Sequence, residues 1–208
     1  EAEIYASNQE LAERSAAVLN DLGNRMIKAS EIIQSDFNQI YKIYDKDLSN
    51  WKEDYRAYSA MALMQSKMVS NRDILLDSDG FLVFLDNRDL VVTTLYDSNT
   101  AHLYQAFSQD GWFHAAMEAN GFPAWTPFYR LDSKYGYTSS VIKDGYMVLS
   151  RRLRSDTSTE FIGTLAIGIL LEPILGETQN IDGNLPYMLL GDEQGLFDLK
   201  GNPYEGLS

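Results

Sequence analysis

The stretch from Gly145 to Leu171 constrains the fold of this 208-residue chain more than any other part of it. Two runs of strand-forming residues, 147–153 and 161–170, flank a short sequence of small polar residues at 155–159. Small polar residues favour turns, and two extended runs around such a turn are typical of an antiparallel hairpin. The chain is therefore expected to contain an antiparallel sheet built around this hairpin.

Alternate residues of a strand point to opposite faces of a sheet, so each face of the hairpin can be examined by itself. In the second strand one face is bulky and carries Phe161, Leu165, Ile167 and Ile169. The other face carries the small residues Thr164, Ala166 and Gly168 and leaves room above the sheet. In the first strand the face opposite Leu149 carries Tyr146, Val148, Ser150, Arg152 and Arg154. Such a sheet could form the floor of a ligand pocket, although an ordinary half-solvated sheet shows the same pattern.

Helices are expected ahead of this hairpin. Apolar residues recur at helical spacing over residues 8–34, and Ser35 and Asp36 are suited to cap a separate short helix that follows. A further helix is predicted over residues 51–68, with Tyr55, Tyr58 and Met68 among its buried side chains. Its methionines are typical of core packing, although a methionine-rich surface could also bind a partner.

The remaining strands are short and are joined mostly by turns. The expected elements are a hairpin of residues 81–85 and 90–95, helices at 99–107 and 110–120, a strand at 125–130, and a last hairpin of residues 187–190 and 196–199. No alternation of strand and helix is present that would indicate a parallel sheet. The predicted class is α+β, with an antiparallel sheet packed against the long N-terminal helix.

The charge of the chain argues against two classes of partner. The formal net charge is −13, whereas binding to nucleic acid or to an anionic membrane surface requires clustered lysine and arginine. The chain has no cysteine, which excludes disulfides, thiolate metal sites and a cysteine nucleophile. No apolar run reaches the length of about 18 residues that a transmembrane helix needs.

The sequence offers no catalytic or metal-binding motif. Its two histidines, His102 and His114, lack the spacing of a zinc site, and no nucleophile elbow, Walker loop or dinucleotide fingerprint occurs. Asp77, Asp79 and Gly80 resemble the start of a calcium loop, but the later ligands are missing. We therefore predict no catalytic residue, no metal and no cofactor.

Aromatic residues accumulate between residues 104 and 146, and four arginines accompany them in the order of elements: Arg130, Arg151, Arg152 and Arg154. Aromatic rings line many small-molecule sites, and arginine pairs well with carboxylates and phosphates. Core packing and a solvated sheet edge are the simpler explanations of the two groups. Taken together, the two groups favour a pocket for a small ligand.

Three stretches resemble the extracytoplasmic Cache domain of bacterial sensor histidine kinases, above all the YesM-like group. The first runs from Asp110 through Trp112 and Phe113 to Gly121 and continues to Pro123 and Trp125. The second comprises residues 149–153, Leu-Ser-Arg-Arg-Leu, and the third comprises residues 161–167, which are similar to the strand that closes the Cache sheet. The long preceding helix fits the same resemblance.

The resemblance implies a long helix, a PAS-like membrane-distal module with the ligand pocket, and a small membrane-proximal β module. In this chain residues 1–69 would supply the helices, residues 70–175 the distal module, and residues 176–208 the proximal module. Transmembrane helices would lie outside both ends, which would place the chain in the extracytoplasmic part of a bacterial membrane protein. The narrow apolar stripe of the long helix would suit a homodimer seam.

The resemblance also implies ligand-binding residues in this chain: Trp112, Trp125, Tyr129, Tyr146, Ser150 and Arg152. The aromatic rings would enclose the ligand, Arg152 would hold an anionic or polar group, and Ser150 would orient it. Amino-acid-binding members carry an arginine where this chain has Gln109 and an aspartate near its Gly168, and both departures weaken an amino-acid reading. A carboxylate, a sugar or a peptide-like molecule could be the ligand, or the pocket could be unused.

Several alternative functions remain open at the level of the sequence. The same domain could belong to a chemotaxis receptor or a diguanylate cyclase, because no output module is present. A secreted enzyme should show turnover with a sharp pH–rate profile. An adhesive ectodomain should have a fully packed aromatic cluster and no cavity.

Overall fold

The computed structural model describes residues 2–48, 54–75, 80–95, 100–131, 145–171, 173, 190–192 and 195–197. The chain divides into two compact units. One consists of residues 25–126 and 148–169, and we call it the sheet unit; the other consists of residues 1–24, 127–147 and 170–208. The predicted domain bounds at residues 69 and 175 stay a prediction. Most of the predicted module 176–208 lies outside the described residues.

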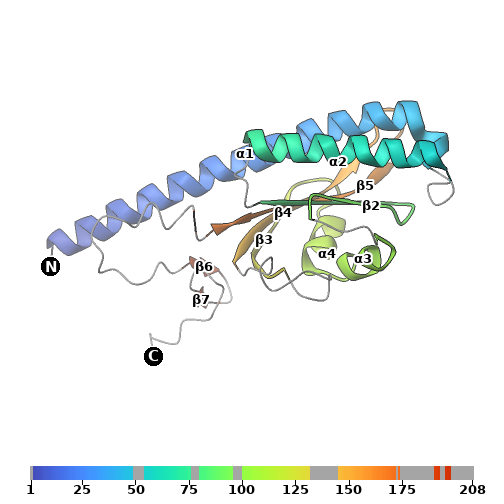
Figure 1. Ribbon diagram of the computed structural model, residues 1–208. Coiled ribbons are helices and arrows are strands. Elements are labelled where there is room, and N and C mark those ends of the chain that lie inside the picture. Colours follow the sequence, from blue (N-terminus) through green and yellow to red (C-terminus); the bar gives the residue numbers. More distant parts are fainter. Residues whose placement is uncertain are drawn as a thin grey trace. The chain divides into compact units, whose positions relative to one another are not determined.

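The N-terminal part is one continuous helix, α1, which spans Ala2–Leu48 (Figure 1). The predicted break at Ser35 and Asp36 is wrong. The buried stripe continues through Phe37, Ile40 and Tyr41, so the helix packs on the sheet beyond the expected end. Asp36 does not cap a new helix; its Oδ1 lies 3.3 Å from Lys67 Nζ of the second helix.

The second helix, α2, spans Tyr55–Leu75. Its buried face follows a helical spacing of small and flexible residues, Ala57, Ala60, Met64 and Met68. The predicted burial of Met68 is confirmed, whereas Tyr55 and Tyr58 are 86% and 67% exposed. Those two tyrosines lie beside the alanines in sequence but on another side of the helix.

A five-stranded antiparallel sheet forms the centre of the fold, with the order β2-β1-β5-β4-β3. The strands are β1 (Phe81–Asp86), β2 (Val91–Thr93), β3 (Ala124–Tyr129), β4 (Tyr146–Arg154) and β5 (Phe161–Leu170). The predicted hairpins β1–β2 and β4–β5 are both confirmed. So is the α+β class with helices packed on an antiparallel sheet.

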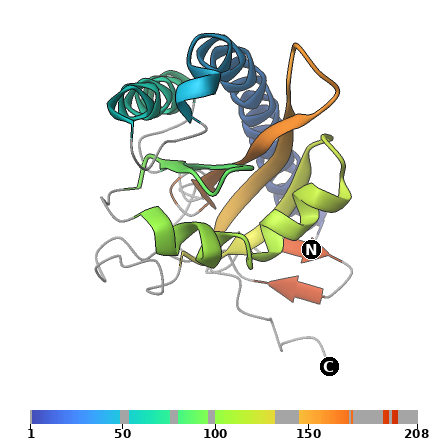
Figure 2. The ribbon, with the colours of Figure 1, turned by 90° about the vertical axis from the view of Figure 1, so that its right-hand side faces the viewer.

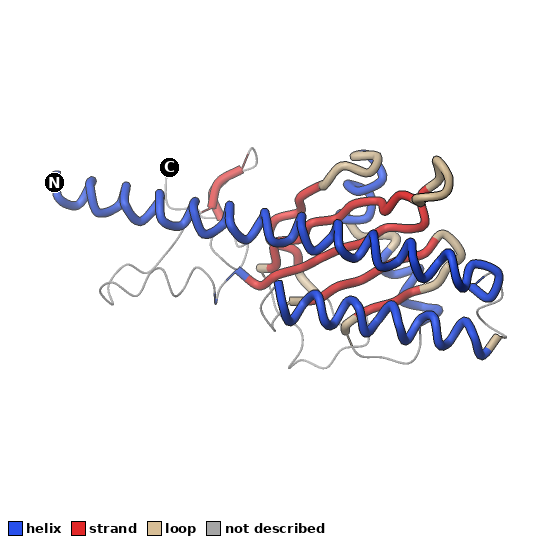
Figure 3. Tube along the Cα trace, turned by 90° about the horizontal axis from the view of Figure 1, so that it is seen from above, coloured by secondary structure: helices blue, strands red, loops and turns tan. Residues whose placement is uncertain are grey.

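Helices α1 and α2 lie side by side over one face of the sheet (Figure 3). The Phe37 ring of α1 meets the Phe84 ring of β1 edge to face, with centroids 4.8 Å apart. Phe84 is opposite Leu165 in the register of β1 with β5. The bulky face predicted for Leu165, Ile167 and Ile169 is therefore the core face beneath these helices.

Two short helices cover the opposite face (Figure 2): α3 (Thr100–Phe107) and α4 (Gly111–Glu118). This face carries the small residues of β5, but the expected room over Gly168 is filled. A Cβ atom at Gly168 would lie 2.1 Å from Cε1 of the Phe81 ring. The small residues of β5 therefore accommodate a core side chain of the neighbouring strand, Phe81, at this point.

The last predicted hairpin is confirmed, but its strands extend into residues predicted as the turn, and the outer parts of both predicted strands lie outside the described residues. Strands β6 (Leu190–Asp192) and β7 (Gly195–Phe197) pair antiparallel, with Leu190 opposite Phe197. Within the part of the chain described, no helix combines the length and apolarity needed to cross a membrane.

Candidate ligand-binding site

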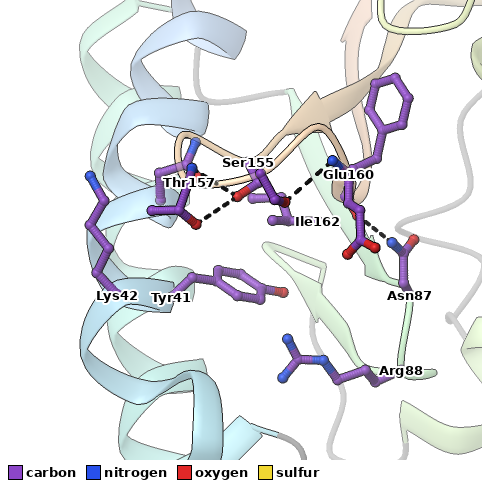
Figure 4. A pocket seen from close by; sticks show the side chains of 11 residues that line it. Tyr41, Lys42, Asn87, Arg88, Ser155, Thr157, Glu160 and Ile162 are labelled. Carbon is purple, nitrogen blue, oxygen red and sulfur yellow. Dashed lines mark hydrogen bonds between the residues drawn. The ribbon is translucent and has the colours of Figure 1, made fainter.

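A pocket of about 510 Å³ lies at one end of the sheet unit, where α1 meets the turns of two hairpins (Figure 4). We call it the hairpin-end pocket. Its lining residues come from three segments that are distant in sequence: Asn38, Tyr41 and Lys42 from α1, Asn87 and Arg88 from the β1–β2 turn, and Ser155, Thr157, Ser158, Glu160, Phe161 and Ile162 from the β4–β5 turn and β5. Most of these side chains are polar.

The β4–β5 turn forms one wall and is shaped by its own hydrogen bonds. Ser155 N–H donates to Glu160 O at 2.9 Å, which closes the hairpin. Ser155 Oγ accepts from Thr157 N–H and lies 3.1 Å from Thr157 Oγ1, and Ser158 Oγ accepts from Glu160 N–H at 3.3 Å. Local bonds of this kind are the reason that serine and threonine favour turns, and here they hold three hydroxyl groups at the pocket.

Asn38 attaches α1 to this hairpin. Its Nδ2 donates to Gln34 O and, at 2.8 Å, to Arg154 O, while its Oδ1 accepts from Asp156 N–H at 3.0 Å. Asn38 is 3% exposed, so these bonds are largely shielded from water. Lys42 Nζ adds a more exposed ion pair, 3.5 Å from Asp156 Oδ2.

The buried carboxylate of Asp86 accepts hydrogen bonds from two residues that line the pocket. Tyr41 Oη donates to Asp86 Oδ2, and Arg88 N–H donates to Asp86 Oδ1 at 2.6 Å. Burial raises the pKa of Asp86 to about 6. The hydrogen bond from the Arg88 backbone and the positive charge of Arg88 act in the opposite direction and lower the pKa. The Arg88 guanidinium lies over the Tyr41 ring at 5.4 Å.

The β1–β2 turn is attached to the start of β5 by Asn87. Asn87 Nδ2 donates to Phe161 O, and Asn87 N–H donates to Ile162 O at 3.4 Å. Asp89 in the same turn has a φ of 64°, in the left-handed region that such a short loop requires. All three segments that line the pocket are thus joined to one another by hydrogen bonds.

The charges around the pocket nearly cancel. Lys42 faces Asp156, and Arg88 Nε lies 3.9 Å from Asp86 Oδ1. The third carboxylate, Glu160, has no hydrogen-bond or ion-pair partner for its oxygens among the described residues. One unpaired negative charge therefore lines a pocket that otherwise offers hydroxyl, amide and paired ionic groups.

The structure brings together two of the six residues predicted to bind ligand, Trp112 and Ser150. Trp112 is fully buried, its indole N–H donates to Asp110 Oδ2 at 3.1 Å, and the Phe107 and Phe113 rings lie about it. Ser150 is also fully buried, and its hydroxyl donates to Trp112 O at 2.8 Å. The Ser150 hydroxyl thus joins β4 to α4.

The other four predicted residues are divided between the two units. Arg152 lies with its Cζ 3.8 Å from the centroid of the Phe161 ring, and Trp125 of β3 is 42% exposed. In the other unit, Tyr129 is half-buried and Tyr146 is buried. The loop predicted over residues 131–140 lies outside the described residues except for Leu131. The ligand-binding role of the six residues stays a prediction.

Phe161 was predicted to share the bulky face of β5 with Leu165, Ile167 and Ile169, but its ring has different surroundings. Its ring lies against the guanidinium groups of Arg152 and Arg154, at 3.8 Å and 4.7 Å. A Cβ atom at Gly121 would approach the same ring to 3.0 Å. Cation–π contact thus accounts for two of the arginines that the sequence associated with an anionic ligand.

The residues of the hairpin-end pocket were not predicted from the sequence as a site. The turn at 155–159 and the turn at 86–89 were recognised only as turns. One signal was available: Asn38 is a polar residue within the apolar stripe of α1, and a buried asparagine requires hydrogen-bond partners. Its partners on the β4–β5 hairpin are more than 100 residues away, so the sequence does not identify them.

Comparisons with known proteins give matches among solved structures alone. No protein-family model matches the chain, and no curated protein matches it. Among solved structures, the ligand-binding domain of the Campylobacter jejuni chemoreceptor Tlp3 in complex with L-valine is similar, with 15% identity, a TM-score of 0.49, and coverage of 95% of this chain and 78% of that chain. The sensory domain of Tlp3 (CcmL) shows 16% identity, a TM-score of 0.46, and coverage of 91% and 73%.

Proposed function

We propose that this chain is the extracytoplasmic ligand-sensing domain of a bacterial membrane signalling protein. The observation that carries the proposal is the construction of the hairpin-end pocket, whose walls are α1 and two hairpin turns. A small molecule in this pocket would contact the helix and both turns at once. Its binding would therefore favour one arrangement of α1 against the hairpins over others.

The mechanism is binding linked to conformation. A ligand shifts an equilibrium between two states only by its difference in affinity for them. Here that difference would arise from contacts to Tyr41 and Lys42 of α1 on one side and to Ser158 and Glu160 of the turn on the other. α1 would pass the change toward the membrane.

The type of signalling protein is a further part of the proposal. The resemblance of residues 110–125, 149–153 and 161–167 to YesM-like Cache domains supports a sensor histidine kinase. A chemotaxis receptor or a diguanylate cyclase with the same ectodomain is the alternative. Homodimerisation through α1 belongs to the same proposal, and sedimentation equilibrium of the purified chain tests it directly.

A thermal-shift screen tests the sensing function. The chain is heated with carboxylates, amino acids, sugars and nucleobases, each in large excess. A ligand at about 100 times its Kd stabilises the folded state by about 2.7 kcal/mol, which for a chain of this size corresponds to a rise in Tm of roughly 5–10 °C. At least one chemical class is expected to produce such a rise.

Two variants connect the response to the pocket. Ser158→Tyr places a bulky side chain on the exposed turn at the pocket and is expected to abolish the rise. Gln109→Tyr makes a similarly bulky change on an exposed turn outside the pocket and is expected to retain it. A wild-type chain that responds to no compound, or a Ser158→Tyr variant that responds fully, would argue against the proposal.

A further inference from the structure

We infer that the hairpin-end pocket binds a neutral polyhydroxylated molecule, a monosaccharide or a cyclitol in chemical class. This inference rests on the proposed sensing function and specifies its ligand. It depends on three properties of the pocket: its charge, its hydrogen-bonding groups and its aromatic side chains.

The charge of the pocket disfavours an anion. Lys42 and Arg88 are the cations of its lining, and each faces a carboxylate, Asp156 or Asp86. Glu160 adds a negative charge without a partner among the described residues. An anionic ligand would find both cations of the lining already facing carboxylates, and it would meet the Glu160 carboxylate on a chain of net charge −13, which disfavours its binding.

The hydrogen-bonding groups of the pocket suit hydroxyl groups of a ligand. Ser155, Thr157 and Ser158 each carry a hydroxyl that can both donate and accept, and the Glu160 carboxylate is a strong acceptor. A sugar hydroxyl also donates and accepts, so neighbouring hydroxyls on one ring can satisfy several of these groups together. An apolar ligand would leave them without partners, at a cost in free energy.

The aromatic side chains supply the apolar part of the site. Figure 4 shows Tyr41 extending from α1 into the space between Arg88 and the β4–β5 turn, with the Glu160 carboxylate on the other side of that space. Phe161 also lines the pocket, with its ring against the guanidinium groups of Arg152 and Arg154. The C–H face of a sugar ring can pack on aromatic carbon while its hydroxyls reach the polar wall.

Titration calorimetry with matched probes tests the charge argument. The probes are glucose, galactose, mannose and myo-inositol, together with glucuronate and glucosamine, which place an anion or a cation on the same skeleton. At least one neutral probe is expected to bind, and glucuronate is expected to bind at least tenfold more weakly than glucose. Tighter binding of glucuronate or of glucosamine than of every neutral probe would overturn the inference.

Glu160→Gln tests the role of the unpaired carboxylate. Glu160 is exposed, so this variant is expected to keep the wild-type Tm without ligand. Its affinity for the best neutral probe should fall about tenfold, because a charged acceptor forms the stronger hydrogen bond. Glu118→Gln, an exposed glutamate of α4 outside the pocket, should bind like wild type; equal affinity of the two variants would contradict the inference.

The outcomes separate this inference from the proposed function. If no polyol binds but another chemical class raises the Tm and Ser158→Tyr abolishes that rise, the ligand class is wrong and the sensing function stands. If no compound of any class binds, both are wrong. If a polyol binds and Ser158→Tyr does not weaken it, the inference about this pocket is wrong.

Discussion

At the scale of single residues, Asp86 is the most informative side chain of the sheet unit. It is 1% exposed and accepts hydrogen bonds from Tyr41 Oη and Arg88 N–H. Burial raises its pKa to about 6 from 3.8, with a contribution from the Asp89 charge, while Arg88 acts in the opposite direction. Burial raises the pKa of Tyr104 on α3, and the Asp89 and Asp86 charges add to this shift.

The raised pKa of Asp86 has a defined effect on stability. Between about pH 4 and pH 6 the folded chain holds a proton on Asp86 that the unfolded chain has lost, so its contribution to stability falls as the pH rises through this range. The loss reaches up to about 3 kcal/mol, since one pKa unit corresponds to about 1.4 kcal/mol.

Asp86→Asn removes this titration and gives the first prediction. The free energy of unfolding of the variant minus that of wild type should increase by up to about 3 kcal/mol between pH 4 and pH 7. Urea unfolding at a series of pH values measures both chains, and the difference cancels the contributions of other carboxylates. A constant difference across this range would show that Asp86 does not titrate as described.

Arg151 and Arg152 are neighbours in the sequence, and we predict that they contribute with opposite sign to the free energy of unfolding. Arg151 Nη1 donates to Ser30 Oγ at 3.3 Å, but its buried Nε has no hydrogen-bond partner within the part of the chain that the structure describes. Burial lowers the pKa of Arg151, Glu31 opposes this shift and Arg154 adds to it. Arg152, in contrast, lies over the Phe161 ring.

Substitution by methionine is expected to separate these two arginines. Arg151→Met should raise the free energy of unfolding by about 1 kcal/mol, because it keeps much of the packing and removes a partly buried charge that is poorly compensated. Arg152→Met should lower it by about 0.5–1 kcal/mol through loss of the cation–π contact. Chemical denaturation measures both. Equal destabilisation by the two changes would refute the assignment.

At the scale of elements, the contact between β1 and β5 determines what the small residues of β5 do. Gly168 is opposite Phe81, whose ring occupies the space where a Cβ would lie. Gly163 has a similar role near the Phe84 ring and Leu85 O. Glycines at these positions permit close packing of large rings from the neighbouring strand.

A pair of substitutions tests this packing. Gly168→Ala should destabilise the fold by about 1–3 kcal/mol, because the new methyl group overlaps a buried ring. In the background Phe81→Leu, which shortens that side chain, Gly168→Ala should cost at least 1 kcal/mol less. A thermal or urea double-mutant cycle gives the coupling. If the changes in the free energy of unfolding caused by the two substitutions are strictly additive, the Phe81 ring does not fill the space beside Gly168.

Elements were predicted well from the sequence where the pattern was local. The β4–β5 hairpin follows from two strand-forming runs around a turn, and both hairpins of the sheet are confirmed. Predictions failed where tertiary contacts decided the result. Asp36 forms an ion pair with Lys67 instead of capping a helix, and Tyr55 and Tyr58 are exposed because alanines occupy the buried face of α2.

At the scale of the whole molecule, the candidate site could not be predicted from the sequence. The hairpin-end pocket joins residues 38–42, 87–88 and 155–162, and only the fold brings these segments together. The stretch that resembles Cache domains led instead to Trp112 and Ser150, whose polar groups bond to Asp110 Oδ2 and Trp112 O. A fold class can follow from local patterns, whereas a pocket built by distant turns requires the structure.

The most direct test of the account is the position of the bound ligand. Amide chemical shifts of the isotopically labelled chain are recorded with and without the compound that raises the Tm most. The account predicts that the largest changes occur in residues 38–42, 86–90 and 155–162. Changes confined to the surroundings of Trp112, Trp125 and Ser150 would contradict it and would move the binding site to the opposite face of the sheet.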